Sequence, residues 1–206
     1  MQTQKDFIRE QILRVAQREF YELGFQKTSL RTIAKKINAT TGIIYSYFKN
    51  KDDLFEEIVK PACDLVINSR LKRQNDVDMF FHDFSLNEKT LLDRDNSLFA
   101  FYVQHYKIEL FILFFRAQGS KMEVFLEDFI EKKAQQYYDN IELLRERGVK
   151  IKMDVDVKFL RLPIRLALTI MEEMISSDFD DKELYEFEHK VTMVLINVWK
   201  SILEVE

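Results

Sequence analysis

The first fifty residues of the chain place hydroxyl and basic side chains where they could bind phosphate groups or other anions. Thr28 and Thr40 stand at the expected first turns of two short helices, where backbone N–H groups and the helix dipole attract negative charge. Lys49 and Lys51 follow the second of these helices. Residues 1–51 hold ten Lys and Arg but four Asp and Glu, a charge of +6, whereas residues 52–206 carry −10. An anionic partner is one interpretation, and chance clustering of charge on a solvated face is the other.

Three helices are expected to carry these side chains. Apolar residues recur at three- and four-residue steps over residues 5–23, and Gly24 follows at the position where helices commonly end. A short helix is expected over residues 30–37, closed by Asn38 in the left-handed conformation, and another over residues 42–48. A long helix followed by two short ones joined by a tight turn is the outline of a helix-turn-helix module.

The residues of this module carry a family resemblance. The matching segments are Phe20 to Phe25, Thr28-Ser29, Ile33-Ala34, Gly42 to Phe48, and Lys51 with Leu54. Over about residues 7–58 the sequence resembles the DNA-binding domain of the TetR family of transcriptional repressors. Asn38, Ala39 and Thr41 stand where that family commonly has Gly, Val and Lys.

The resemblance implies a set of DNA contacts, and the chemistry of the residues agrees with it. Hydroxyl and basic groups would bind phosphates, and Gly42 would let the backbone approach the duplex closely. Ile44 and Phe48 are expected to point inward and the tyrosines outward. Plain N-caps at the threonines, a tolerated surface Gly42 and partial core packing of Tyr47 remain the alternatives. The expected DNA-binding residues are Thr28, Ser29, Arg31, Thr40, Thr41, Gly42, Ile43, Tyr45, Ser46, Tyr47, Lys49 and Lys51.

The rest of the chain is expected to be helical as well. Four Gly and two Pro among 206 residues make β architectures rich in turns improbable and exclude glycine-rich nucleotide loops. Periodicity predicts helices at about 51–72, interrupted at Pro61, and at about 96–106, 107–118, 121–147, 157–177 and 181–205. We expect an all-α protein of about nine helices, with a DNA-binding domain at residues 1–50 and an effector-binding and dimerisation domain at residues 51–206.

Several other classes of protein are disfavoured by the sequence. The longest purely apolar run, from Leu110 to Phe115, is far shorter than the roughly 20 residues of a membrane span. The first residues lack the apolar region of a signal peptide, and a single cysteine suits a cytoplasmic protein. His105 and Glu109 share a helix face, but two ligands do not make a metal site. We expect no enzyme activity, no metal, no cofactor and no membrane segment.

Aromatic residues are concentrated between residues 80 and 129. An aromatic layer in a helical protein is more often ordinary core than a pocket. The resemblance, however, implies an effector cavity in this region, which would bind an apolar or aromatic small molecule. The candidate effector contacts are Phe80, Phe84, Phe99, Tyr102, His105, Tyr106, Phe111, Phe114 and Phe115.

The last two helices have wider apolar surfaces than one core needs. Apolar residues form two stripes along residues 181–205 and a similarly wide arc along residues 159–175, whereas a surface helix needs one stripe. The second stripe predicts a homodimer with two helices from each subunit, and full burial within one chain is the alternative. The expected interface residues are Ile164, Leu168, Met171, Ile175, Val191, Leu195, Val198 and Ile202.

These features predict a TetR-type repressor that binds a palindromic operator in double-stranded DNA as a homodimer. A small-molecule effector would release it from DNA. The alternative is a helical ligand-binding or scaffold protein that retains the basic N-terminal module without operator control.

Overall fold

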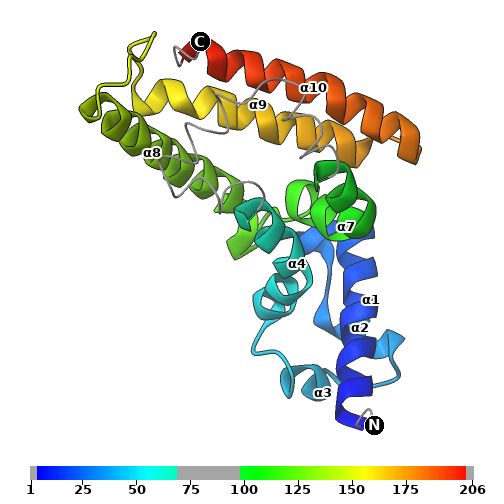
Figure 1. Cartoon of the computed structure of the whole chain (residues 1–206). Coiled ribbons are helices and arrows are strands. Elements are labelled where there is room, and N and C mark those ends of the chain that lie inside the picture. Colours follow the sequence, from blue (N-terminus) through cyan, green and yellow to red (C-terminus); the bar gives the residue numbers. More distant parts are fainter. Residues whose placement is uncertain (1–3, 69–97, 203–206) are drawn as a thin grey trace. The chain divides into compact units, whose positions relative to one another are not determined.

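The computed structural model describes residues 4–68 and 98–202, and all elements assigned within these ranges are helices (Figure 1). They are α1 (Gln4–Lys27), α2 (Leu30–Lys36), α3 (Thr41–Tyr45), α4 (Lys51–Asn68), α7 (Leu98–Phe115), the 3₁₀ helix η2 (Lys121–Val124), α8 (Phe125–Glu146), α9 (Val157–Ser176) and α10 (Asp181–Ile202). The all-α fold expected from the sequence is confirmed. No helix in the described ranges is both long and apolar enough to cross a lipid bilayer.

The helices group into two compact units. Unit 1 comprises Met1–Asp64 and Tyr106–Phe125, and unit 2 comprises Leu65–His105 and Leu126–Glu206. The chain therefore passes from one unit to the other inside α4, inside α7 and at the start of α8. The expected DNA-binding helices α1 to α3 all belong to unit 1, together with a segment that is distant in sequence, Tyr106–Phe125.

Most helix ends lie close to the expected positions, and the residues at the breaks have the expected conformations. Gly24 and Asn38 adopt positive φ angles of 76° and 54°. Tyr106 has non-helical angles (φ −132°, ψ 26°), so α7 is kinked at the boundary expected between helices at 96–106 and 107–118. The interruption expected at Pro61 is wrong, because α4 continues through it. A proline removes one N–H, and α4 is held on both sides of it by the buried Val59 and Ala62.

The core of unit 1 is built around three phenylalanines. Phe20 of α1 lies edge-to-face on Phe55 of α4, with ring centroids 4.9 Å apart. Phe25, directly after the Gly24 break, packs on the same Phe55 ring at 5.2 Å. Ile33 of α2 and Ile44 of α3 are also fully buried. Burial of these side chains holds the two short helices, since helices of seven and five residues are marginal on their own.

The core of unit 2 lies among α8, α9 and α10. Each helix contributes one buried stripe, with Ile141 on α8, Leu160 on α9 and Ile196 on α10 as examples. Tyr137 and Trp199 join α8 to α10 edge-to-face, with centroids 4.8 Å apart. The side chain of Asp156 caps α9 by accepting a hydrogen bond from the Phe159 N–H at 2.7 Å.

Candidate nucleic-acid interface

The turn between α2 and α3 fixes the direction of the third helix. After α2, the N–H of Asn38 donates to the Lys35 carbonyl at 3.1 Å and that of Ala39 to the Ala34 carbonyl at 2.9 Å. Asn38 can take the left-handed conformation required there because its short polar side chain tolerates a positive φ. Ile44 then anchors α3 in the core of unit 1.

Helix α3 has an inner and an outer face, as the sequence predicted. Ile44 is fully buried, and Phe48, three residues beyond the helix, is 4% exposed. On the other side, Tyr45 is 57% and Ile43 is 39% exposed. Tyr47 is half-buried, so it contributes partly to the core. An exposed isoleucine and tyrosine on so short a helix form a surface suited to contact with another molecule.

Exposed hydroxyl groups lie at the N-termini of both short helices. Ser29 and Thr40 occupy the N-cap positions of α2 and α3, yet neither side chain makes a capping hydrogen bond. Ser46, at the end of α3, donates its hydroxyl hydrogen to the Ile43 carbonyl at 2.7 Å. Thr41 is half-buried. The uncapped hydroxyls and the first N–H groups of the two helices suit phosphate oxygens.

Gly42 lies exposed in α3 and has no packing requirement of its own. A Cβ atom built on it would meet one neighbouring atom, the Thr40 hydroxyl oxygen, at an ordinary 3.6 Å. Its φ is not in the left-handed region, unlike those of Gly24, Gly119 and Gly148. The fold of the chain therefore accepts alanine at this position. If glycine is required here, the requirement comes from a bound partner such as DNA and not from packing within the chain.

Two of the expected DNA contacts have roles inside unit 1. Thr28 is 3% exposed, and its hydroxyl hydrogen-bonds to the carbonyls of Gly24 at 2.8 Å and Glu19 at 3.1 Å. The Thr28 side chain therefore lies in the interior of unit 1 and is not part of the exposed surface. The ammonium of Lys51 donates to the carbonyls of Phe25 at 2.8 Å and Thr28 at 3.1 Å.

Lys51 thus stabilises the turn between α1 and α2 through these hydrogen bonds. Its nitrogen also lies 4.1 Å from the centroid of the Phe25 ring, and burial lowers the pKa of its ammonium below the ordinary value. Two of its three N–H groups are used by these carbonyls, one in the last turn of α1 and one just after it. Among the basic residues expected to contact DNA, Arg31 and Lys49 are the exposed ones.

Sequence reasoning missed two features that support this surface. Glu19 on α1 is buried and forms an ion pair with Lys36 of α2. No sequence pattern marks it, because the partners are 17 positions apart. Asn50 accepts a hydrogen bond from the Asp53 N–H, and the Asp53 side chain accepts one from the Lys49 N–H, both at 2.9 Å. The Asn-x-x-Asp spacing at the start of a helix could have indicated this second arrangement.

The residues expected to contact the effector fall partly in unit 1, partly in unit 2 and partly outside the described residues. Phe80 and Phe84 lie outside the described residues, and the side chain of Phe99 is not among those described. Tyr102 and His105 belong to unit 2, whereas Tyr106, Phe111, Phe114 and Phe115 belong to unit 1. Phe111 packs on Tyr21 of α1 at 4.7 Å, so it joins two helices of unit 1. His105 stacks on Phe101 at 4.0 Å and contacts its carbonyl through Nδ1 at 2.8 Å.

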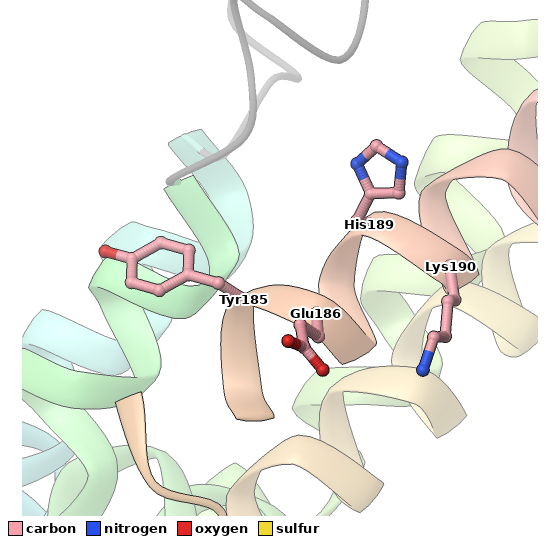
Figure 2. A pocket seen from close by; sticks show the side chains of 4 residues that line it. All are labelled: Tyr185, Glu186, His189 and Lys190. Carbon is pink, nitrogen blue, oxygen red and sulfur yellow. The ribbon is translucent and has the colours of Figure 1, made fainter. Parts of the chain in front are cut away.

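A surface depression of about 420 Å³ lies on α10 and is lined by Tyr185, Glu186, His189 and Lys190 (Figure 2). None of the expected effector contacts lines it. Figure 2 shows the four side chains leaving the helix in different directions, with the Tyr185 hydroxyl and the His189 ring turned away from each other. Groups that do not converge on one point cannot enclose a small molecule, so the depression does not have the geometry of an effector site.

The expected dimer residues are mostly part of the chain's own core. Ile164, Leu168, Met171, Ile175 and Ile202 are each at most 9% exposed within the chain. These five side chains are thus buried in the single chain, on the inner stripes of α9 and α10. Val191, Leu195 and Val198 are half-buried. The exposed apolar side chains lie on other faces: Leu162 at 59% and Leu166 at 36% on α9, and Val194 at 50% on α10.

Comparison with known proteins agrees with the geometry of α1 to α4. Residues 12–58 match the family model described as bacterial regulatory proteins, tetR family. The chain is 52% identical over 50 residues to the HTH-type transcriptional regulator AcrR of Shigella flexneri, which is 24% of this chain and 23% of that protein. It is 43% identical over 47 residues to the uncharacterised HTH-type regulator YhgD of Bacillus subtilis, 23% of this chain and 25% of that protein.

The fold of the chain is similar to that of solved proteins over nearly its whole length. The structure of the ketosteroid transcriptional regulator KstR2 of Mycobacterium tuberculosis matches with a TM-score of 0.57 and 18% identity, covering 92% of this chain and 93% of that one. The matches to AcrR and YhgD span about a quarter of the length of those relatives. Unit 1 therefore contains, over residues 12–58, a helix-turn-helix domain of the type found in the tetR family of bacterial regulatory proteins.

Proposed function

We propose that this chain is a homodimeric transcriptional repressor that binds a palindromic operator and is released by a small-molecule effector. The observation that carries the proposal is the outer face of α3, where exposed Ile43 and Tyr45 flank a glycine that the fold does not require. This face belongs to a domain that matches the tetR family model. Such a function places the protein with the chromosome, in the cytoplasm.

The proposed contact surface combines phosphate-binding and base-reading groups. Ser29 and Thr40 offer uncapped hydroxyls beside helix N-termini, and Arg31 and Lys49 offer exposed cations. Base edges would be read by Thr41, Gly42, Ile43 and Ser46, with Tyr45 and Tyr47 at the phosphates. Since these base-reading residues are small or apolar, we propose that thymine methyl groups and the shape of the DNA contribute much of the specificity.

A homodimer is supported by the exposed apolar side chains of α9 and α10. Leu162 and Leu166 lie on one stripe of α9, one turn apart, and Val194 lies between the half-buried Val191 and Val198 on α10. Leu184, Ile196 and Trp199 show that α10 already has a complete buried stripe. A second apolar stripe on each helix is best explained by a second copy of the chain.

Release by an effector requires that unit 2 influence unit 1. Helix α7 runs from unit 2 into unit 1 at the Tyr106 kink. At its C-terminal end, Arg116 donates a hydrogen bond to the Tyr21 carbonyl of α1. A ligand bound in unit 2 that prefers one position of α7 would therefore bias the position of the DNA-binding helices. The effector must bind the form that does not fit the operator more tightly than the form that does.

The proposal is tested by selecting binding sites from random double-stranded DNA. We expect enrichment of a palindrome with half-sites about one helical turn, roughly 34 Å, apart, because a two-fold dimer places two α3 helices in successive major grooves. The selected site is then measured by fluorescence anisotropy against a scrambled duplex at two salt concentrations. If no sequence is enriched, the chain is instead a helical ligand-binding or scaffold protein that retains the domain.

A further inference from the structure

Unit 2 contains a buried lysine on the inner face of α8. The Lys133 side chain is 5% exposed and lies on the same stripe as the core residues Ile130, Ala134 and Tyr137. Its ammonium donates to the Gln136 side-chain oxygen at 2.7 Å and lies 4.9 Å from the centroid of the Tyr137 ring. Lysine is among the residues least often found fully buried, so its place in this stripe calls for a reason.

Lys133 has no carboxylate partner among the residues that the structure describes. The buried acid of α10, Glu188, accepts a hydrogen bond from the Ala100 N–H at 3.2 Å. Burial lowers the pKa of Lys133 to about 8. A neutral amide and a ring face compensate a desolvated ammonium only in part. Among the described residues, the contacts of the ammonium are therefore with neutral groups, Gln136 and Tyr137.

The surroundings of Lys133 combine apolar and polar groups in the way that ligand sites do. Tyr137 and the buried Asn140 lie one and two turns along the same stripe of α8. Trp199 of α10 packs on Tyr137. Aromatic side chains together with a few fixed polar groups and one charged group are the residue types that typically line sites for small organic ligands.

We infer that Lys133 is the anion-recognising residue of the effector site and that the effector is an apolar molecule carrying one anionic group, such as a carboxylate or sulfonate. This inference rests on the proposed effector regulation and adds the chemical class of the ligand. The ammonium pairs with the anionic group, Gln136 orients the ammonium, and the apolar part of the ligand lies against the aromatic residues. Binding then supplies a counter-charge to the ammonium inside unit 2.

The test uses two fluorescent probes that differ by one group: 1-anilinonaphthalene-8-sulfonate (ANS) and its uncharged parent, N-phenyl-1-naphthylamine (NPN). Binding to the full chain is titrated for the wild type, Lys133→Met, Lys133→Arg and the control Lys132→Met, whose side chain is exposed on the same helix. We expect saturable ANS binding that weakens at least tenfold in Lys133→Met. Lys133→Arg and Lys132→Met should bind ANS as the wild type does, and NPN should bind all four proteins alike.

A stability measurement separates an anion site from a structural ion pair. If Lys133 lacks a counter-ion, Lys133→Met should unfold at the same temperature as the wild type or a higher one. Three results would overturn the inference: no saturable ANS binding by the wild type, equal ANS affinity of Lys133→Met and Lys132→Met, or an equal loss of NPN affinity. Since the titration needs no DNA, a failed operator selection with intact Lys133-dependent ANS binding would refute the repressor function and leave the anion site standing.

Discussion

Arg116 and Tyr21 join the second half of α7 to α1 within unit 1. The Nε–H of Arg116 donates to the Tyr21 carbonyl at 3.0 Å, and the Arg116 carbonyl accepts from the Phe25 N–H at 2.9 Å. The Gly24 break explains this arrangement, because it leaves backbone groups at the end of α1 without helical partners. The helix that enters from unit 2 thus provides hydrogen bonds that complete the first helix of the DNA-binding domain.

Replacing Arg116 with methionine should destabilise unit 1. The variant loses the bond to the Tyr21 carbonyl and the contact of the guanidinium with the Phe111 ring at 5.1 Å. Because Arg116 is half-buried, we expect the free energy of unfolding to fall by about 1–2 kcal/mol, as measured by urea denaturation. Arg14→Met, at an exposed position of α1, is the control and should change stability by less than about 0.5 kcal/mol. Equal free energies of unfolding of the two variants would show that the Arg116 side chain does not stabilise the contact between α7 and α1.

Gly42→Ala should separate folding from DNA binding. The added Cβ meets the Thr40 hydroxyl oxygen at an ordinary 3.6 Å, and alanine is the better helix former by up to about 1 kcal/mol. Thermal stability should therefore stay the same or rise, while affinity for the selected operator falls at least tenfold because the methyl group holds the duplex away. Anisotropy titration of the same preparation measures the second effect. Unchanged affinity would identify Gly42 as a tolerated surface glycine.

Lys49 and Lys51 should differ in how they depend on salt. Lys49 is exposed, so Lys49→Ala should leave the melting temperature unchanged and reduce the slope of log K against log salt by roughly 0.9, the value of one phosphate contact. Lys51→Met removes two bonds to carbonyls and should lower the free energy of unfolding by about 1–3 kcal/mol. If Lys51→Met reduces the salt slope and Lys49→Ala does not, the assignment of the two lysines is reversed.

Charged substitutions on the exposed stripes should break the proposed dimer without unfolding the chain. Leu162→Glu and Val194→Glu change side chains that are 59% and 50% exposed, so circular dichroism should be unchanged. Sedimentation should show monomers, because a carboxylate cannot be buried unpaired at an interface. His189→Glu adds the same charge to an exposed position on a different face of α10 and should remain dimeric. Dimers in both stripe variants would place the interface elsewhere.

The burial of Lys133 should be visible in the dependence of stability on pH. Its pKa is about 8 in the folded chain and 10.5 when exposed, so between these values the unfolded chain binds more protons and stability rises with pH. Below pH 8 the full penalty, about 3 kcal/mol, is present. Urea denaturation at pH 7.5 and pH 10 should therefore show a gain for the wild type that Lys133→Met lacks. If the free energy of unfolding changes equally with pH in the two proteins, the Lys133 side chain is exposed to water in solution.

The sequence by itself determined the all-α fold and the DNA-binding domain. Local rules decide these features: apolar residues at helical spacing, Gly24 and Asn38 at positive φ, and the motif around Gly42 and Tyr45 act within a few residues of one another. The inward position of Ile44 and the outward position of Tyr45 follow from the same periodicity. Helix boundaries in α9 and α10 were likewise predictable from apolar repeats.

Tertiary structure alone decided which side chains remain available. Thr28 and Lys51 resemble phosphate ligands in the sequence, but partners more than a helical turn away engage them inside unit 1. The two apolar stripes of α9 are equivalent by periodicity, and packing within unit 2 selects the one that contains Leu168 for the core. Lys133 is one of many lysines until the fold buries it beside Gln136 and Tyr137. Burial and pairing depend on contacts between distant segments, and one helical pattern is compatible with several such contacts.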